Sequence, residues 1–276
     1  MELSVLILTR NEQHDLPKCL DSVSWCQDIH VLDSFSEDKT VEIARRYGAH
    51  VTQHKFEGYA SQRNFGLHEV HFKNQWVLML DADERVPPDL AREIQDAISS
   101  NSDRVAYRIR RRDYYMKREL KHAQISPWFI RLVRPAEVYY EREVNEVLRT
   151  RGQIGELRSC FDHYPFSKGL DYWIDRHNRY STMEAEVGNF RASSDHASVP
   201  RGLFSVDPNE RRRHQKKLFY RLPFRPLLKF CYMTFVRGAF LDGRPGIRYA
   251  VLQSIYEYFI VLKQEELNTR RSEEGV

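Results

Sequence analysis

The chain has 276 residues, of which 41% are hydrophobic and 30% are charged. This composition predicts one or two folded domains with a sizeable core, and it excludes a collagen-like, low-complexity or disordered protein. The net charge is only +4, so charge can direct function only where it is concentrated. The four cysteines form no C-x-x-C pair, which favours a reducing compartment over a zinc site or a disulfide framework.

Neither a secretory leader nor a membrane-spanning helix is expected. Glu2 and Arg10 bracket a short strand-like run where a leader would have its apolar core. The most apolar later stretches, 227–241 and 249–262, are both interrupted by charged residues, and a spanning helix needs about 20 apolar residues.

Through the first hundred residues, strand-like and helix-like segments alternate. Short apolar runs predict strands at 3–8, 29–32 and 76–80, of which the first and last should be buried, and 49–52 is expected to be a further short strand. Helices are expected around 16–23, 40–47, 58–70 and after Pro87–Pro88. This alternation predicts a parallel sheet with right-handed crossovers, which binds ligands at the carboxyl ends of its strands.

After about residue 100 the pattern changes. Residues 104–110 alternate between apolar residues and arginine, as in a strand with one buried face, and 123–162 contains further short strand-like pieces. A helix is expected over 167–190, followed by a polar linker over 191–212. Residues 213–267 look helical, with breaks near Pro223, Pro226 and 243–246.

The strongest chemical signal is Asp81-Ala82-Asp83-Glu84, directly after the expected strand 76–80. One carboxylate can reach a sugar hydroxyl while the other meets a metal ion, and hard oxygen ligands suit Mg²⁺ or Mn²⁺ bridging phosphates. The competing interpretation is a solvated acidic turn before a helix, whose N-terminus favours negative charge.

Three further polar motifs also follow or accompany the strands. Asp33 follows the second strand, and its carboxylate can accept the imide N–H of a uracil ring; nearby Asp38 is expected to cap the next helix. Thr9-Arg10-Asn11-Glu12 follows the first strand, and Gln62-Arg63-Asn64 lies in an expected helix. The chain contains neither G-x-G-x-x-G nor a P-loop motif, which argues against a dinucleotide-dependent dehydrogenase and a P-loop enzyme.

Together these ordered motifs resemble the family 2 glycosyltransferases, which have the A-type nucleotide-sugar (GT-A) fold. The later part resembles the bacterial subgroup that builds lipopolysaccharide core, including the heptose β-1,4-glucosyltransferases. That second likeness lies in residues 128–132, Asn145-Glu146, Asp162-His163-Tyr164 and the 240–246 sequence Phe-Leu-Asp-Gly-Arg-Pro-Gly. The subgroup often has His where this chain has Asn145.

The resemblance implies an α/β, Rossmann-like GT-A fold with a mostly parallel sheet and a C-terminal helical, basic extension. We expect a catalytic domain over 1–165, with a nucleotide-binding half (1–100) and an acceptor-side half (101–165). Residues 166–276 would form the helical, membrane-associating region.

The resemblance also implies roles for individual residues. Asp33 and Arg63 would contact the nucleotide base, with Thr9 and Glu12 lining the same pocket. Asp81 would contact the ribose or a metal-bound water. Asp83 would bind Mg²⁺ or Mn²⁺ directly, and the cation would neutralise charge on the departing diphosphate.

An inverting transfer needs a base to take the proton of the acceptor hydroxyl. Glu146 is the candidate, and Glu141 and Glu143 are its nearby competitors. His163 could complete the metal or phosphate site, or could be a structural residue fixed by the turn at Tyr164-Pro165.

The positive charge is concentrated between Arg211 and Lys229, where eight Lys or Arg residues stand without a single acid among aromatic and leucine residues. Such a stretch indicates a membrane surface or nucleic acid, or else a solvated helix face. In the absence of a nucleic-acid motif we expect an anionic membrane, with Phe219, Tyr220, Leu222 and Phe224 reaching the headgroups.

The sequence therefore predicts an inverting glycosyltransferase that uses a nucleotide-sugar donor, with UDP-sugar favoured. Its acceptor would be a lipid-linked saccharide of lipopolysaccharide core or a related envelope glycan, at the inner face of the cytoplasmic membrane. The alternatives are a polyprenyl-phosphate glycosyltransferase and a non-catalytic basic module on a degenerate nucleotide fold.

Overall fold

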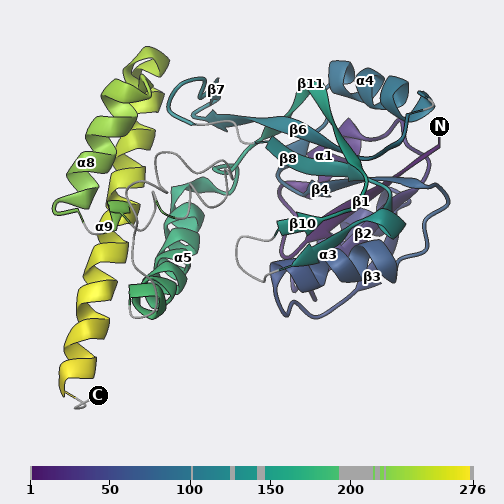
Figure 1. Cartoon of the computed structure of the whole chain (residues 1–276). Coiled ribbons are helices and arrows are strands. Elements are labelled where there is room, and N and C mark those ends of the chain that lie inside the picture. Colours follow the sequence, from purple (N-terminus) through teal and green to yellow (C-terminus); the bar gives the residue numbers. More distant parts are fainter. Residues whose placement is uncertain are drawn as a thin grey trace. The chain divides into compact units, whose positions relative to one another are not determined.

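A computed structural model describes residues 2–100, 102–124, 128–141, 147–192, 214, 218–220 and 222–273, with the backbone alone for 187–192 and 272–273. The chain divides into two compact units (Figure 1). Unit 1 comprises Met1–Glu119 and Ser126–Lys168, and unit 2 comprises Leu120–Ile125 and Gly169–Val276. The division falls at 168–169, where we expected it at 165–166, and the short segment 120–125 belongs to the second unit.

Unit 1 begins with alternating strands and helices. Their bounds are β1 (Leu3–Thr9), α1 (Leu16–Ser22), β2 (Ile29–Asp33), α2 (Thr40–Arg46), β3 (His50–Gln53), α3 (Tyr59–His68), β4 (Trp76–Asp81), β5 (Glu84–Arg85) and α4 (Pro88–Ser99). Mostly strands follow: β6 (Arg104–Tyr115), β7 (Arg118–Glu119), β8 (Trp128–Val133), the 3₁₀ turn η1 (Pro135–Glu137), β9 (Tyr139–Glu141), β10 (Val147–Arg149) and β11 (Gln153–His163).

The main sheet has the strand order β3-β2-β1-β4-β8-β6-β11-β5. The first four strands are parallel, as the alternating pattern predicts. Strand β8 runs antiparallel to both of its neighbours, and β11 pairs parallel with β6. The sheet thus has a parallel half, β3-β2-β1-β4, and a mixed half, β8-β6-β11-β5. This is the GT-A arrangement that the sequence predicts.

The core lies on both faces of the sheet. Alternate residues of β1 point to opposite faces, so Leu3, Val5 and Ile7 pack with α1, α2 and α4, while Leu6 packs with α3. Figure 1 shows α3 and α4 on opposite faces. Helix α3 sits close to the sheet at Gly66, where an added Cβ would come within 2.7 Å of the Leu6 side chain. Gly66 therefore allows α3 to lie close to the sheet, and this distance positions the polar residues of α3.

Unit 2 is helical. Its elements are α5 (Gly169–Ala192), α8 (Arg225–Cys231), the π-helical turn η2 (Tyr232–Val236), the 3₁₀ turn η3 (Ala239–Asp242) and α9 (Gly243–Glu273). Helix α8 runs beside α9 (Figure 1), and the Arg225 side chain is held between Glu257 and Gln264 of α9. No helix in the described part of the chain is long and apolar enough to cross a membrane.

A carboxylate holds the inserted segment 120–125 in unit 2. Asp242 accepts hydrogen bonds from the backbone N–H groups of His122 (2.9 Å) and Ala123 (2.7 Å), and its other oxygen lies 2.8 Å from Nδ1 of His122. At Gly246 an added Cβ would lie 2.1 Å from the Ala239 carbonyl oxygen. The 240–246 motif, whose role the sequence leaves open, is therefore a structural clamp and tight turn.

Two expectations for the membrane-facing stretch are wrong. Arg225 is only 5% exposed and pairs with Glu257 inside unit 2. Tyr220 donates a hydrogen bond to Glu184 and lies under the Arg225 guanidinium, 4.4 Å from it. Both side chains bind partners inside unit 2, because the packing of the helices brings those partners close. The basic sequence pattern does not reveal this packing. Arg211–Arg213, Lys216, Lys217 and Arg221 lie outside the described residues.

Candidate active site

Three polar side chains come together because parallel strands end at the same edge of the sheet. Strand β1 ends at Thr9, β2 at Asp33 and β4 at Asp81. In the register of the sheet Thr9 lies beside Asp33, and Leu8 lies beside Asp81. The carboxyl ends of these strands, where such sheets bind ligands, therefore bring the three polar side chains to one edge.

Asp33 is fully buried, and both of its carboxylate oxygens are occupied. Oδ1 accepts hydrogen bonds from the hydroxyls of Thr9 (3.0 Å) and Ser36 (2.5 Å). Oδ2 accepts from the backbone N–H of Ser36 (2.9 Å) and from Nε2 of Gln53 (3.1 Å). Because a carboxylate has about four acceptor sites, Asp33 can bind a nucleobase only by giving up one of these bonds. In this state it shapes the turn after β2.

That turn holds a side chain that the sequence reasoning missed. Phe35 has a left-handed backbone (φ 53°) and is 57% exposed. A non-glycine residue in this region costs about 1–3 kcal/mol, and such strain is often found at ligand sites. Asn11 at the end of β1 is also left-handed (φ 56°). Asp38, which we expected to cap the next helix, lies one residue before the N-cap Lys39, and it accepts a hydrogen bond from the backbone N–H of Thr40 at 3.0 Å.

Glu12 offers an unused acceptor at the same edge. Its Oε1 lies 2.6 Å from Nζ of Lys168, while its Oε2 is buried and has no hydrogen-bond partner among the described residues. Burial raises the pKa of Glu12 to about 7 despite the opposing charge of Lys168. A buried oxygen without a partner is costly, so Oε2 suits a ligand hydroxyl or amide. Lys168, far away in the sequence, was not predicted.

Asp81 lies between two arginines. Its Oδ2 is 2.7 Å from Nη2 of Arg131, and its Oδ1 is 3.4 Å from Nη2 of Arg63. Burial alone would raise the pKa of Asp81, but these guanidinium groups outweigh it and hold that pKa well below its usual range. Arg63, which we expect to contact the nucleotide base, contacts Asp81 and lies over the Tyr140 ring.

Arg131 also secures Glu84, the last residue of the acidic motif. Its Nη2 lies 2.5 Å from Oε1 of Glu84, whose Oε2 accepts a hydrogen bond from the Asp81 backbone N–H at 3.0 Å. Burial raises the pKa of Glu84 to about 7 against the influence of Arg131. The sequence analysis did not single out Arg131. The sequence did carry a signal for it, because Arg131 is the one charged residue in the apolar run 128–133.

Asp83 meets His163 because β5 and β11 pair antiparallel, with Glu84 opposite His163. Nε2 of His163 lies 3.4 Å from Oδ2 of Asp83, and its Nδ1 lies 2.5 Å from Oδ1 of Asp113. Burial alone would lower the pKa of His163, but Asp83 and Asp113 outweigh it and raise that pKa to about 9. Asp113, which the sequence did not single out, is held in turn by Arg111 at 2.9 Å.

These side chains suit a cation that is shared with a substrate. The described residues contain no group of three or more His, Cys, Asp or Glu that could hold a metal alone. Mg²⁺ commonly takes only one or two carboxylates and completes its shell with substrate phosphates and water. The Asp83 carboxylate fits that donor set, whereas Nε2 of His163, 3.4 Å away, would add a nitrogen ligand only when unprotonated and suits Mn²⁺ better than Mg²⁺. The contact of Asp113 to Nδ1 resembles the outer partner of a metal-binding histidine.

The candidate base could not be placed, because Glu146 and its competitor Glu143 lie outside the described residues. Glu141 is described, and it pairs with Arg149 at 2.9 Å on the exposed β9–β10 hairpin. Trp128 is 39% exposed and has two arginine side chains over its ring, Arg108 and Arg110.

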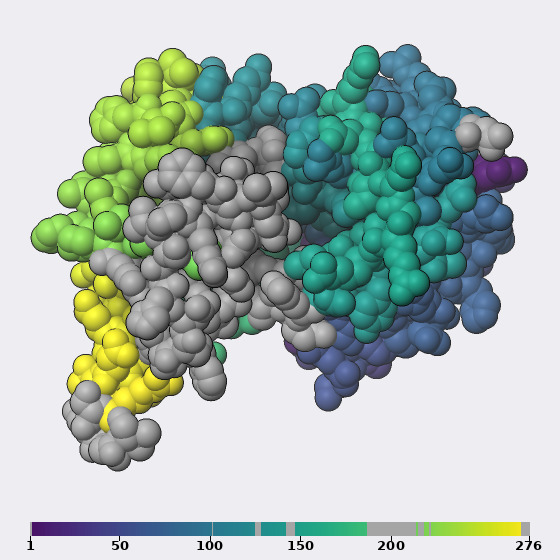
Figure 2. Space-filling view, viewed as in Figure 1, coloured from purple at the N-terminus to yellow at the C-terminus, as the bar shows by residue number. Residues whose placement is uncertain are grey.

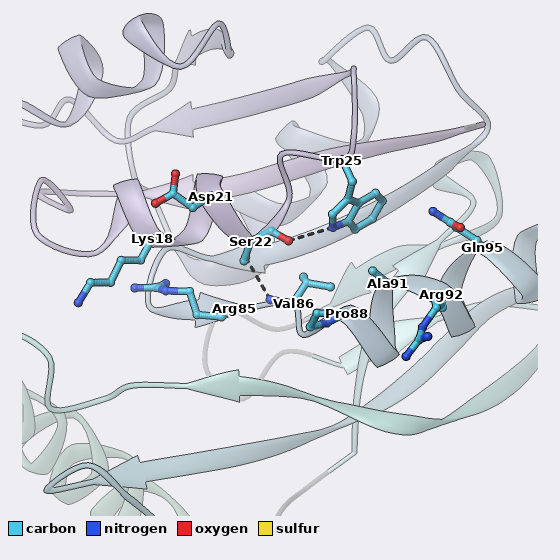
Figure 3. Close-up of a pocket in the computed structure, with 10 residues that line it drawn as sticks. All are labelled: Lys18, Asp21, Ser22, Trp25, Arg85, Val86, Pro88, Ala91, Arg92 and Gln95. Atoms are coloured by element: carbon cyan, nitrogen blue, oxygen red, sulfur yellow. Dashed lines mark hydrogen bonds between the residues drawn. The ribbon is translucent and has the colours of Figure 1, made fainter.

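A separate pocket of about 800 Å³ lies between α1 and α4 (Figure 3). It is lined by Lys18, Asp21, Ser22, Trp25, Arg85, Val86, Pro88, Ala91, Arg92 and Gln95. Ser22 accepts a hydrogen bond from the Val86 backbone there, at 3.1 Å. Its lining contains none of the residues that the sequence predicts for the site, so this hollow is not the strand-end cluster.

Among proteins of known sequence, the lipopolysaccharide core biosynthesis glycosyltransferase LpsC of Rhizobium meliloti is 25% identical over 95% of this chain and 92% of its own length. An uncharacterized glycosyltransferase of Rickettsia bellii is 40% identical over 40% of this chain and 37% of its own length.

Two solved structures are also similar. Staphylococcus aureus TarS aligns over 91% of this chain and 55% of its own, at 14% identity and a TM-score of 0.42. Glucosyl-3-phosphoglycerate synthase of Mycobacterium tuberculosis aligns over 41% of this chain and 43% of its own, at 20% identity and a TM-score of 0.33.

The family model for glycosyl transferase family 2 matches residues 4–164. This range begins in β1, ends just after His163, and thus includes every described residue that the sequence predicts for the site. The match covers more than half of the chain. Together with the strand order and the acidic strand ends, it establishes that this chain is a glycosyltransferase and belongs to glycosyl transferase family 2.

Proposed function

We propose that this enzyme transfers a sugar, with inversion, from a nucleotide-sugar donor to a saccharide acceptor of lipopolysaccharide core or a related envelope glycan. The single observation that carries the proposal is the cluster at the end of β4, where Asp81 is followed by Asp83 and His163 lies beside Asp83. The family match supports the sugar-transfer chemistry. The name of the Rhizobium relative, which is similar along nearly the whole chain, supports the class of acceptor.

For the donor we favour a uridine diphosphate sugar. Thr9, Glu12 and Asp33 would surround the base, and Arg63 would form part of the same wall through its contact with Asp81. The buried, unpartnered Oε2 of Glu12 supports a polar ligand here. Asp81 would accept a hydrogen bond from the ribose, and its two arginine partners keep it ionised for that task.

A divalent cation, Mg²⁺ or Mn²⁺, would be held by Asp83 and His163. When bound, such a cation supplies charge neutralisation for the departing diphosphate. Asp113 keeps the His163 ring oriented with Nε2 toward Asp83. Lys168 and Arg63 add fixed positive charge near the same edge.

Glu146 is proposed as the base that takes the proton of the acceptor hydroxyl while the sugar is displaced from the opposite face in one step. If the acceptor were a polyprenyl phosphate instead, its own oxygen would already be ionised and no protein base would be needed. Loss of transfer on removing the Glu146 carboxylate therefore separates the two acceptor classes.

We also propose that the enzyme works at the inner face of the cytoplasmic membrane on a lipid-linked acceptor, without nucleic-acid binding. The basic stretch between Arg211 and Lys229 supports an anionic surface as partner. The non-catalytic alternative is not retained, because the family is one of transferases and Asp33, Arg63, Asp81 and Asp83 are all present.

A panel of nucleotide sugars, assayed by thermal shift with and without Mn²⁺, tests the donor proposal. A ligand that binds only the folded state at a hundred times its Kd stabilises the protein by about 2.7 kcal/mol. We expect the largest shift with a uridine diphosphate sugar plus Mn²⁺, and no shift in Asp83→Ala. A metal-independent shift of equal size would contradict the proposed cation site.

A further inference from the structure

The segment from Leu222 to Leu241 presents a row of exposed apolar side chains. The most exposed are Val236 (74%), Phe235 (68%), Leu241 (61%) and Leu227 (60%), together with Phe224 at 79%. Figure 2 shows the yellow-green atoms of α8 and the start of α9 open at the surface in that view. Soluble proteins rarely expose apolar residues in contiguous groups without a partner.

The row follows from the way α8 and η2 pack. Phe224, Leu227 and Leu228, then Tyr232 and Phe235, recur at helical spacing and are all more than 40% exposed. The opposite side is packed: Arg225, Met233 and Thr234 are each 6% exposed or less. The segment is therefore amphipathic in its structure, with one face in unit 2 and the other uncovered among the described residues.

The charge of this segment indicates which kind of partner the face binds. The sequence from 211 to 241 contains nine Lys or Arg residues and no Asp or Glu. Of those cations, Arg225, Lys229 and Arg237 lie within the apolar segment itself; Arg225 is buried, and the other two are half-buried. A segment that is apolar and carries cations but no acid in its sequence complements an anionic bilayer, in which lipid tails receive the apolar groups and headgroups receive the cations.

A second copy of the chain fits this face less well. A symmetric dimer through it would place Lys229 and Arg237 of one copy against the same cations of the other, because such an interface uses one patch on both subunits. Like charges so placed repel each other. No described helix could span a membrane, so the expected mode is a segment lying in the interfacial plane.

We propose that the Phe224–Leu241 face, made of α8, η2 and η3, inserts into the interfacial layer of an anionic membrane. This inference rests on the proposed function for its purpose, since a lipid-linked acceptor lies in that plane. It differs from purely electrostatic attachment through 211–217, because the apolar side chains carry the binding and the cations set the preference for anionic lipid.

The test is co-sedimentation with vesicles of phosphatidylglycerol and phosphatidylcholine, compared with phosphatidylcholine alone. Leu227→Ser combined with Phe235→Ser changes two exposed positions, so folding should be preserved, and circular dichroism checks this. We expect binding to anionic vesicles to fall at least about tenfold, since each side chain loses its transfer from water. Ile174→Ser on α5, also apolar and 38% exposed, is the matched control and should bind as wild type.

A spectroscopic arm reports insertion directly. After subtraction of the wild-type emission, which comes from the four native tryptophans, the fluorescence of Phe235→Trp should shift to the blue on vesicle addition and be quenched by lipids brominated in their acyl chains. Unchanged vesicle binding in the double variant, or quenching no greater than that of Ile174→Trp, would overturn the proposal. Lipid-free dimerisation that the double variant abolishes would assign the face to a second copy instead.

Metal-dependent hydrolysis of nucleotide sugars in lipid-free solution separates this proposal from the proposed function. The double variant should retain that activity in full. If wild type bound vesicles as expected but hydrolysed no nucleotide sugar, the proposed donor chemistry would fail while the membrane face would stand.

Discussion

The two units use their apolar residues differently. Among the described residues, large hydrophobic side chains that are exposed number seven in unit 1 and seventeen in unit 2. Unit 1 packs apolar side chains on both faces of its sheet, and it holds the buried carboxylates of Asp33 and Glu84 close to strand ends. Unit 2 buries the ion pair Arg225–Glu257 and leaves apolar residues outside. The contrast teaches that the polar groups of unit 1 are the candidates for ligand binding, whereas the exposed apolar groups of unit 2 are the basis of the membrane proposal.

Removing the Asp83 carboxylate should have the largest effect and should be confined to unit 1. Asp83→Ala deletes one of the two side chains proposed to hold the cation, an interaction worth several kcal/mol, so sugar transfer should fall by about a thousandfold. Activity assays over a Mn²⁺ titration measure this, with vesicle binding as the control that should not change. Wild-type turnover in the variant, or in excess chelator, would refute the metal role.

Arg131→Met should destabilise unit 1 by about 4 kcal/mol. It leaves the buried Glu84 carboxylate without its charged partner, and breaking a buried pair on one side costs about 3–5 kcal/mol. Denaturant unfolding measures the loss. In Arg131→Met combined with Glu84→Gln, part of the stability should return. Equal loss in both variants would mean that packing alone, and not the ion pair, holds this end of β4.

Glu12 should make unit 1 less stable as the pH rises. Its pKa of about 7 lies above the unfolded value of 4.5, so between these values the folded state binds the extra proton and stability falls with pH. The difference corresponds to about 3 kcal/mol lost between pH 4.5 and 7. Glu12→Gln should lack this pH-dependent part of the free energy of unfolding. Denaturant unfolding of both proteins at pH 5 and at pH 8 measures the difference. Parallel pH dependences in the two proteins would contradict it.

Glu146→Gln should slow transfer by about a hundredfold while donor binding persists, as for the loss of a general base. Single-turnover transfer and donor thermal shifts distinguish the two effects. Glu143→Gln is the matched control. If that control loses activity and Glu146→Gln does not, Glu143 is the base.

The sequence by itself determined the parallel half of the sheet and the edge at which its candidate ligand residues lie. Alternating apolar runs and helical spacing place Asp33, Asp81 and Asp83 at strand ends whatever the details of packing, because the carboxyl ends of parallel strands share one edge. The family resemblance determined the class of reaction. It could not place Glu146, for which no geometry is described.

Only the tertiary structure decided which charges meet. Arg131, Asp113 and Lys168 reach Asp81, His163 and Glu12 across 50 or more residues of sequence, and no local periodicity encodes such contacts. The same holds for Asp33, whose hydrogen bonds are already filled, and for Arg225, which is buried although it belongs to a basic stretch. Sequence period fixes which face a side chain occupies, while burial and long-range pairing decide its partner and therefore its charge state.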